Sequence, residues 1–522
     1  MNTRTALSLS EIFYLSLLIL LFFAKGIGLY DGQPQFKAVL VFALFCYGAK
    51  MLMTKYNWRE LLLIGLILVI GTVSYLISGE KGMLLYLMMV TGMKNVPLER
   101  IFKVSFVTWS ISFGGMALLT ATHIIDSPFK IHDRFGFGFL IRWGLGHSHP
   151  NVLHISYLTF AMLAIYLLGK KINLKWLSLL MLGNLYIFLY SLSSTGFIAV
   201  CLLLLLNLYW LYRGKFAFFE KILIYSILPA CLLLTFAAPL ILTGRAFEII
   251  NKILNTRLNL TRHFLTTAPM TLFGTRTAEI TSHWLTMDNS YLFAYATYGI
   301  ILSALIITAY FLIIRRFIKA GKGMELSIII TCLFTGVIEQ FLFNGSFKNI
   351  SLLFFGELIF EKNPGRQHKI IKFLPSKISN YTLSFPDCSS VIKQKLAQIN
   401  LFYHNTKRHL YLAFGIFAMI GIIIANSLMV LPDAYISPRK HCDEKEGEIW
   451  IYLDSQAVAE AEAQNKKVLQ YIDEKTVMLE FSGNIVTLEW LRGVVTAGIL
   501  SGLTGIAVVF IVLRWRYLWV KE

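Results

Sequence analysis

The stretch TGFIAVCLLLLLNLYWLY, residues 195–212, contains no charged side chain and is long enough to cross a bilayer as a helix. About 20 consecutive apolar residues span the hydrocarbon core of a membrane. Comparable runs recur along the chain, which has 522 residues and is 56% hydrophobic and 15% charged. Soluble domains carry about 25% charged residues, so a soluble fold would have too little polar surface. The sequence therefore predicts a multi-pass membrane protein.

Fourteen apolar runs are candidate spans, and the fourth and twelfth of them are short. Their approximate ranges are 10–29, 36–53, 60–78, 82–94, 101–121, 151–168, 174–192, 195–212, 221–243, 289–314, 325–343, 346–360, 410–430 and 491–513. We therefore expect an all-α polytopic membrane protein with about 12 transmembrane helices, followed by a C-terminal two-span hairpin that carries a small extracytoplasmic domain.

The loop charges predict the orientation. Lys and Arg accumulate in cytoplasmic loops, and the strongly basic connections fall on one side if both termini are cytoplasmic. The net charge of +19 then reflects this rule, and because the basic residues lie between spans we predict no nucleic-acid partner. Three long segments would face outward, at about 122–150, 244–288 and 431–490.

The same pattern divides the chain into three parts. Residues 1–362 form the predicted main membrane domain, residues 363–409 a basic cytoplasmic linker, and residues 410–522 the two-span hairpin around the outer domain 431–490. The six cysteines include no CxxC pair and no Cys/His cluster with metal spacing, so neither a zinc site nor a disulfide framework is expected.

The first outer segment ends in RWGLGHSHPN, residues 142–151, directly before an apolar run. Pro150 suits the first turn of a helix, and a helix N-terminus favours anions. Arg142 would add a permanent charge with bidentate geometry for phosphate, while His149 and Asn151 would stand at the same helix mouth. The alternative is an ordinary polar loop at a membrane interface.

The second outer segment is also rich in arginine, with Arg257, Arg262 and Arg276 among its residues. Residues 248–265 have helical apolar spacing and could lie along the interface as an amphipathic helix. The arginines could then extend toward lipid headgroups. An outward cluster of arginines nevertheless opposes the positive-inside bias. Its position therefore favours a role in binding an anionic ligand.

Carboxylates lie near both clusters. Asp288 and Asn289 stand at the predicted outer end of a span, where they could cap the helix, and Asp288 could alternatively serve as a base. Glu339 lies within an apolar run. A carboxylate inside the membrane is costly and usually marks a pathway or an ion pair.

Taken in order, these motifs resemble bacterial O-antigen and capsular polysaccharide polymerases, the Wzy-like group, which is related to the O-antigen ligases. The matching elements are RWGLGHSHPN (142–151), SLSSTG (191–196), NTRLNL with TLFGTRT (255–277) and DNSYLFAYATYGI (288–300). The resemblance covers about residues 1–362. Many members have an arginine where Thr195 stands, and the ligase branch has a histidine where Asp288 stands, although His283 lies close by.

The resemblance implies a membrane glycosyltransferase that joins polyprenyl-diphosphate-linked oligosaccharide units at the outer leaflet of the bacterial plasma membrane, in capsule, O-antigen or exopolysaccharide biosynthesis. Arg142, Arg257 and Arg262 would bind the diphosphate, and His149 or Asp288 would be the general base. We expect no metal and no cofactor, and a chain-length regulator or a flippase as a possible protein partner. The alternatives are a flippase for lipid-linked oligosaccharide, ligase-like transfer to another acceptor, and a structural or sensory protein that binds a partner through its outer domain.

Overall fold

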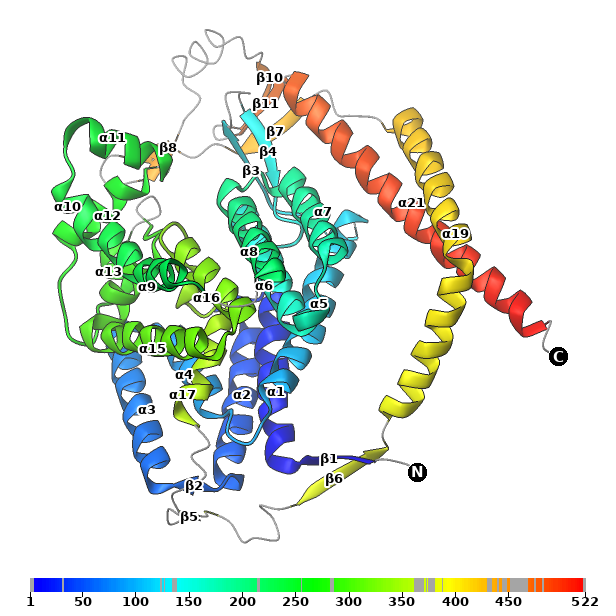
Figure 1. Cartoon of the computed structure of the whole chain (residues 1–522). Helices are drawn as coiled ribbons and strands as arrows, with labels where there is room; N and C mark the ends of the chain where they lie inside the picture. The colour runs from blue at the N-terminus through cyan, green and yellow to red at the C-terminus, as the bar shows by residue number, and fades with distance from the viewer. Residues whose placement is uncertain are drawn as a thin grey trace. The chain divides into compact units, whose positions relative to one another are not determined.

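The computed structural model in Figure 1 divides into two compact units, which we describe separately. Unit 1 comprises Met1–Leu7, Phe129–Arg142 and Leu383–Glu522, and unit 2 comprises Ser8–Pro128 and Trp143–Thr382. The structure describes all residues except 1–3, 31, 123, 126, 134–138, 214–215, 255, 282–285, 361–369, 372, 374–380, 387, 430–433, 439–440, 444–447, 451–467, 474–475, 481–482 and 520–522.

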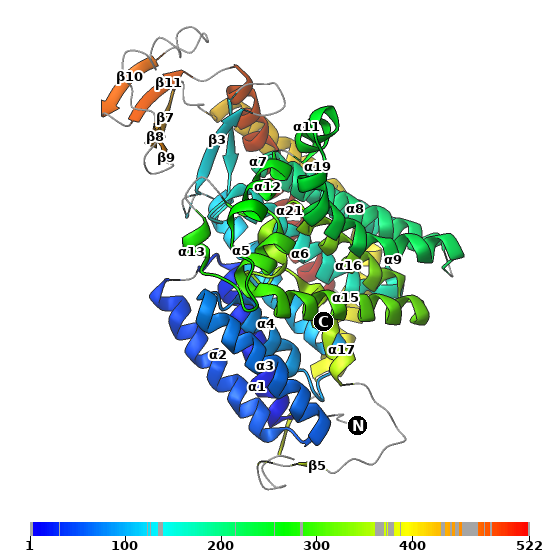
Figure 2. The ribbon, with the colours of Figure 1, turned by 90° about the vertical axis from the view of Figure 1, so that its left-hand side faces the viewer.

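Unit 2 is a bundle of helices, in which α1 packs against α2 and α5 (Figure 2). The long helices are α1 (Leu9–Gly26), α2 (Pro34–Met53), α3 (Trp58–Ser78), α5 (Leu98–Ala121), α6 (Pro150–Leu168), α7 (Leu174–Ser191), α8 (Ser194–Tyr212), α9 (Phe218–Leu232) and α15 (Gly299–Ala320). The shorter helical elements are α4 (Gly82–Thr91), η1 (Gly169–Lys171), η2 (Leu233–Ala237), α10 (Ala238–Ile241), α11 (Gly244–Ile253), α12 (Arg257–Thr267), α13 (Thr277–Ile280), α14 (Ser290–Phe293), η3 (Ala294–Tyr298), α16 (Gly323–Gly336), η4 (Gln340–Leu342), η5 (Ile350–Phe355) and α17 (Gly356–Ile359). Strands β2 (Tyr56–Asn57) and β5 (Ile370–Ile371) pair at one end.

In the described part of the chain, 11 helices are long and apolar enough to cross a membrane. The protein is therefore a multi-pass, helical membrane protein, as predicted. The prediction of about 12 spans plus two was too high, because three runs form short helices: Gly82–Thr91, Gly323–Gly336 and Ile350–Ile359. At 1.5 Å per residue, their 10 to 14 residues reach about 15–21 Å, whereas the hydrocarbon core is about 30 Å thick.

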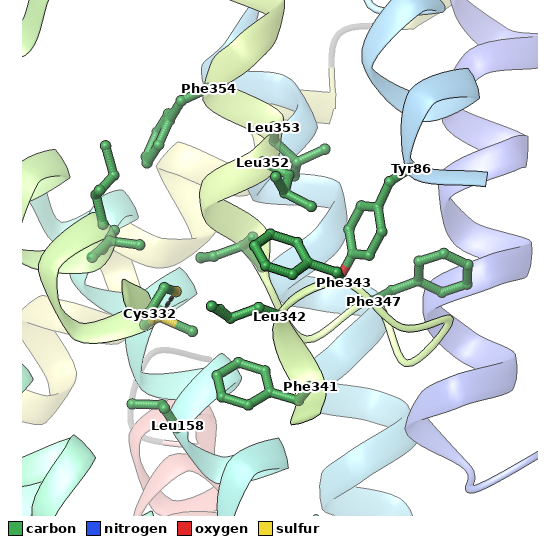
Figure 3. Packing of buried hydrophobic residues seen from close by; sticks show 14 of the residues in the cluster. Tyr86, Leu158, Cys332, Phe341, Leu342, Phe343, Phe347, Leu352, Leu353 and Phe354 are labelled. Carbon is green, nitrogen blue, oxygen red and sulfur yellow. Dashed lines mark hydrogen bonds between the residues drawn. The ribbon is translucent and has the colours of Figure 1, made fainter. Parts of the chain in front are cut away.

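The segment 337–349, between α16 and η5, is a loop packed inside unit 2, in which η4 is a single three-residue 3-10 turn (Figure 3). Phe347 is fully buried and contacts the rings of Phe22 and Tyr86. A Cβ atom on Gly82 would lie 2.3 Å from the backbone nitrogen of Gly345, so the first turn of α4 touches the loop closely. Irregular backbone at membrane depth is tolerated where protein buries it, and this loop meets that condition.

Helix α6 contacts α5, α7, α8 and α16, and it is the most buried of the candidate spans. His154, on its second turn, fixes its position. The imidazole Nδ1 lies 2.8 Å from Ser191 Oγ, and Nε2 lies 2.8 Å from Asn184 Oδ1. Because the three side chains are fully buried, we interpret them as a structural link that holds the N-terminal end of α6 against α7.

Unit 1 is built on two long helices, α19 (Cys388–Leu428) and α21 (Gly483–Trp519). Small residues bring them close, since a Cβ on Gly421 would lie 2.3 Å from Ser501 Oγ and one on Gly502 would lie 2.6 Å from the Phe414 ring. Such contacts are typical of helix pairs in membranes. The predicted linker 363–409 is thus helical from Cys388, and the runs 410–430 and 491–513 are parts of these longer helices.

The strands of unit 1 are short. Strand β11 (Thr476–Glu480) pairs antiparallel with both β7 (Ala434–Pro438) and β10 (Val468–Asp473), and β8 (His441–Asp443) pairs with β9 (Glu448–Trp450). Strands β3 (Phe129–Asp133) and β4 (Phe139–Trp143) pair with each other, as do β1 (Arg4–Ser8) and β6 (Thr382–Pro386). The predicted outer segments 122–150 and 431–490 therefore add small sheets to an otherwise helical protein.

Candidate functional site

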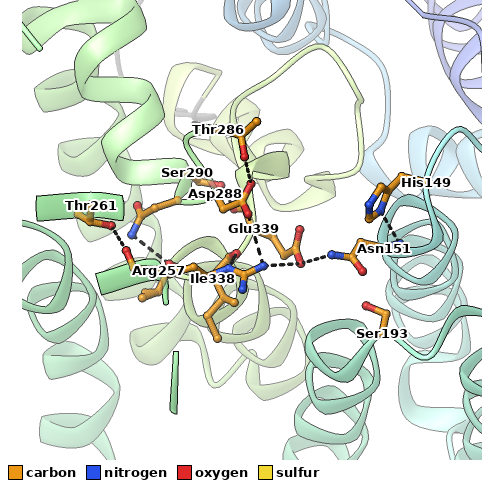
Figure 4. A network of polar contacts seen from close by, with 12 residues as sticks. His149, Asn151, Ser193, Arg257, Thr261, Thr286, Asp288, Ser290, Ile338 and Glu339 are labelled. Carbon is orange, nitrogen blue, oxygen red and sulfur yellow. Dashed lines mark hydrogen bonds and ion pairs between the residues drawn. The ribbon is translucent and has the colours of Figure 1, made fainter. Parts of the chain in front are cut away.

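A polar network in unit 2 is centred on Arg257, the first residue of α12 (Figure 4). Its guanidinium Nε donates to the carbonyl oxygen of Ile338 at 2.5 Å. Nη2 lies 3.7 Å from a carboxylate oxygen of Asp288 and 3.6 Å from one of Glu339. The Arg257 side chain is 9% exposed, that of Glu339 14% and that of Asp288 39%. A largely buried cation therefore faces one buried carboxylate and one that solvent reaches.

The N-terminal end of helix α6 contributes further residues to the network. Asn151 Nδ2 donates to Glu339 Oε1 at 3.1 Å, so Glu339 lies between Asn151 and Arg257 (Figure 4). His149 is the N-cap residue of α6, and its Nδ1 accepts the backbone N–H of Asn151 at 3.0 Å. A ring nitrogen that accepts a hydrogen bond carries no proton, so in a neutral ring Nε2 carries the hydrogen. This tautomer makes His149 a donor at Nε2 and disfavours it as a general base.

Asn289 and Ser290 position the loop that carries Glu339. The Asn289 side-chain oxygen caps α14, and its Nδ2 donates to Thr235 Oγ1 and to the Val337 carbonyl, both at 3.0 Å. Ser290 Oγ donates to the Glu339 carbonyl at 2.5 Å. The predicted cap at the start of this helix is confirmed for Asn289, which is a positioning residue here.

The structure brings together six of the predicted residues, namely His149, Asn151, Arg257, Asp288, Asn289 and Glu339. They come from four segments that lie far apart in the sequence. Both carboxylates lie farther from the Arg257 guanidinium than a hydrogen bond, at 3.7 and 3.6 Å. The Asp288 carboxylate is the more exposed of the two.

Arg262 lies in a different environment from Arg257. Its guanidinium donates to the carbonyls of Pro239 and Leu242, at 2.5 and 2.6 Å, and lies 3.9 Å from the centre of the Phe247 ring. These contacts join α12 to the end of α10 and to the amphipathic α11. These contacts give Arg262 a structural role. The prediction that it binds a diphosphate stays a prediction.

Three further predicted residues are Arg276, His283 and Arg142. Arg276 is exposed at the start of α13, and His283 lies outside the described residues. Arg142 is buried and belongs to unit 1, where Arg492 donates to the carbonyl of its neighbour Ile141 at 2.9 Å. The predicted convergence of Arg142 with Arg257 stays a prediction.

Two buried residues near the site were not among the predicted site residues. Lys348 is 4% exposed, and its Nζ donates to the carbonyl of Val152 on α6 at 3.1 Å. His147 is 1% exposed and stacks on Phe113. Burial, and secondly the charge of Lys348, lowers the pKa of His147 to about 3, so its ring is neutral at physiological pH. Besides Glu339, the lysine inside the apolar run 346–360 was a second sequence signal for the loop 337–349.

No family model, curated protein or solved structure matches this chain. Among the described residues, no three His, Cys, Asp or Glu side chains are grouped so that they could hold a metal ion. The geometry of the Arg257 network therefore carries the functional assignment.

Proposed function

We propose that this protein is a membrane glycosyltransferase that polymerises polyprenyl-diphosphate-linked oligosaccharide units at the outer face of the plasma membrane. The observation that carries the proposal is the largely buried Arg257 guanidinium, which faces the solvent-accessible carboxylate of Asp288 at 3.7 Å. A cation for a departing diphosphate and a base for an attacking hydroxyl are the two groups that such a transfer needs. The order of sequence motifs that resembles the Wzy-like polymerases supports the same assignment.

The distribution of charge along the helices supports an outward-facing site. Helix α6 begins beside the network and ends directly before Lys170 and Lys171. Helix α15 follows the Asp288 segment and ends in Arg315, Arg316 and Lys319. By the positive-inside rule these basic ends are cytoplasmic, so the helix ends at the network belong to the outer side.

The proposed step is a displacement at the anomeric carbon of the donor sugar. Asp288 takes the proton of an acceptor hydroxyl, and the hydroxyl oxygen forms the new bond to the anomeric carbon. The bond from that carbon to the diphosphate oxygen breaks, and the lipid diphosphate leaves with the electron pair. Arg257 would stabilise the charge that grows on this oxygen, which lowers the barrier only if it binds the transition state better than the ground state.

The remaining residues would orient these two groups. Glu339 accepts from Asn151 and lies beside the guanidinium, so it fixes the direction of the Arg257 side chain. His149 caps α6 through Nδ1 and thereby positions Asn151 beside Glu339.

Gel analysis of lipid-linked glycan in cells tests the proposal. Cells that lack the protein should accumulate single repeat units on the outer face, and the wild-type gene should restore long chains. Arg257→Ala should not restore them, whereas Arg245→Ala should, because Arg245 is exposed on α11. Long chains from a properly inserted Arg257→Ala variant would contradict the assignment.

A flippase for the same lipid is the second candidate. The short α16 and the buried loop 337–349 resemble the broken helices that line transporter sites. A flippase predicts that repeat units accumulate on the inner face when the gene is deleted. The location of the accumulated units therefore distinguishes the two functions.

A further inference from the structure

An apolar cavity of about 220 Å³ lies between the helix pair α9–η2 and the pair η3–α15 in unit 2. Its walls include Phe236, Tyr291 and Ser303. Tyr291 and Ser303 are buried, whereas Ile300 and Ala304 on the same wall are exposed. Since α15 is a candidate span, the exposed side of the cavity faces the bilayer.

Both walls depart from regular helix where the cavity opens. Residues 233–237 (η2) and 294–298 (η3) are π-helical, and single π-turns inside α-helices are frequent at functional sites. Gly299, which follows η3, has φ of +82°, and a Cβ there would lie 2.5 Å from the carbonyl oxygen of Leu272. A regular helix could not take this path.

Two chain segments contribute to both the cavity and the Arg257 network. Asp288 faces Arg257, and Tyr291, three residues later, lines the cavity. On the other wall, Thr235 accepts from Asn289, and the neighbouring Phe236 ring lies 5.3 Å from that of Tyr295. The polar site and the cavity thus share both supporting segments.

We propose that this cavity holds the first isoprene units of the polyprenyl carrier whose diphosphate faces Arg257. The inference rests on the proposed function, because it assumes a lipid diphosphate at the network. A headgroup at Asp288 places the attached chain beside Tyr291, and the opening toward the bilayer lets the rest of the chain remain in lipid. The hydroxyl of Tyr291 already donates to the Leu333 carbonyl, so that wall presents mainly apolar surface.

A second apolar cavity, of about 450 Å³, provides a matched control. It is lined by α3, α4, α15 and the η5–α17 segment, and Thr91 and Ile359 on its wall are the last residues of their helices. Ile359 lies two residues after Glu357, which pairs with Arg316 and Lys322 near the basic end of α15. Ala304 lines the first cavity and Ala309 the second, so one helix offers both positions.

The test is photocrosslinking of the full chain in vesicles to a polyprenyl diphosphate without sugar. A photoreactive phenylalanine replaces Ala304 or Ala309. We expect at least about tenfold more crosslinking at position 304 than at position 309. Adding Arg257→Ala should remove that difference, because a loss of about 1.4 kcal/mol in binding free energy lowers the affinity tenfold. Equal labelling at the two positions, or labelling that Arg257→Ala does not reduce, would overturn the inference.

A paired elongation assay separates this inference from the proposed function. Ser303→Phe should raise KM at least about tenfold for a repeat unit on a long polyprenyl chain and leave KM unchanged for one on a short prenyl chain. Ser303→Ala is the control, because Ser303 Oγ has no hydrogen-bond partner in the described part of the chain. Equal effects on both substrates would overturn the inference. If the protein is crosslinked selectively at position 304 but the wild type elongates neither substrate, the proposed function is wrong and the lipid site is still supported.

Discussion

Replacing Arg257 by alanine should separate the stability of the site from its chemistry. The guanidinium donates a hydrogen bond to the Ile338 carbonyl, and a hydrogen bond that involves a charged group contributes about 1.5–3 kcal/mol. The ion pairs with Asp288 and Glu339, at 3.7 and 3.6 Å, exceed hydrogen-bond distance. For the partly exposed Asp288 the ion pair adds less than about 1 kcal/mol. We therefore expect Arg257→Ala to lower the free energy of unfolding by about 2–4 kcal/mol.

The double variant Arg257→Ala with Glu339→Gln provides the decisive comparison. The amide removes the carboxylate that would otherwise stay buried without its cation, so part of the lost stability should return. Elongation should not return, because loss of a preorganised charge at the leaving group costs about 100- to 1,000-fold in rate. Thermal unfolding in detergent and initial elongation rates in vesicles measure the two effects. If rate and stability recover together, Arg257 has a structural role and the proposed chemistry is wrong.

Three further substitutions test other parts of the structure. Asp288→Asn keeps the size of the side chain but removes the proposed base, so elongation should fall by at least about 100-fold while the thermal midpoint changes little; full activity would exclude Asp288 as the base. Gly196→Ala would place a Cβ 2.5 Å from the ring of His154, and this overpacking should lower the unfolding free energy by about 1–3 kcal/mol, as measured by thermal unfolding. The pKa of His147 is lowered to about 3 from its ordinary 6.5, so the unfolded chain takes up the proton first and stability falls as the pH drops from about 6.5 toward 3. His147→Phe keeps the stacking on Phe113 and should remove this loss of stability at low pH. Above pH 7 this histidine contributes no pH dependence to the unfolding free energy.

Hydropathy predicted the class of fold but overestimated the number of spans. The runs 325–343 and 346–360 read as two crossings because Phe341, Leu342 and Phe347 are as apolar as lipid-facing residues. In the structure these side chains are buried against other protein segments. Hydropathy measures the preference for an apolar environment, and it does not distinguish lipid from a protein interior.

The candidate site was predictable in its residues and less so in their pairing. Asp288 and Asn151 were identified from their position at helix mouths, and Glu339 from the cost of a carboxylate in an apolar run. The sequence could not show that Glu339 accepts from Asn151, 188 residues away. Nor could it separate Arg257 from Arg262, because only the fold shows which of them has backbone carbonyls of α10 as partners.

The early end of α16 and the polar network are one structural feature. In a continuous helix the carbonyls of residues 337–339 would accept from backbone N–H groups four residues later. Because α16 ends at Gly336, these three successive carbonyls accept instead from the side chains of Asn289, Arg257 and Ser290. A backbone carbonyl that is packed inside the protein needs a hydrogen-bond partner. A helix long enough to cross the membrane here would therefore remove the acceptors that fix Arg257, so the shortness of α16 is a condition for the site.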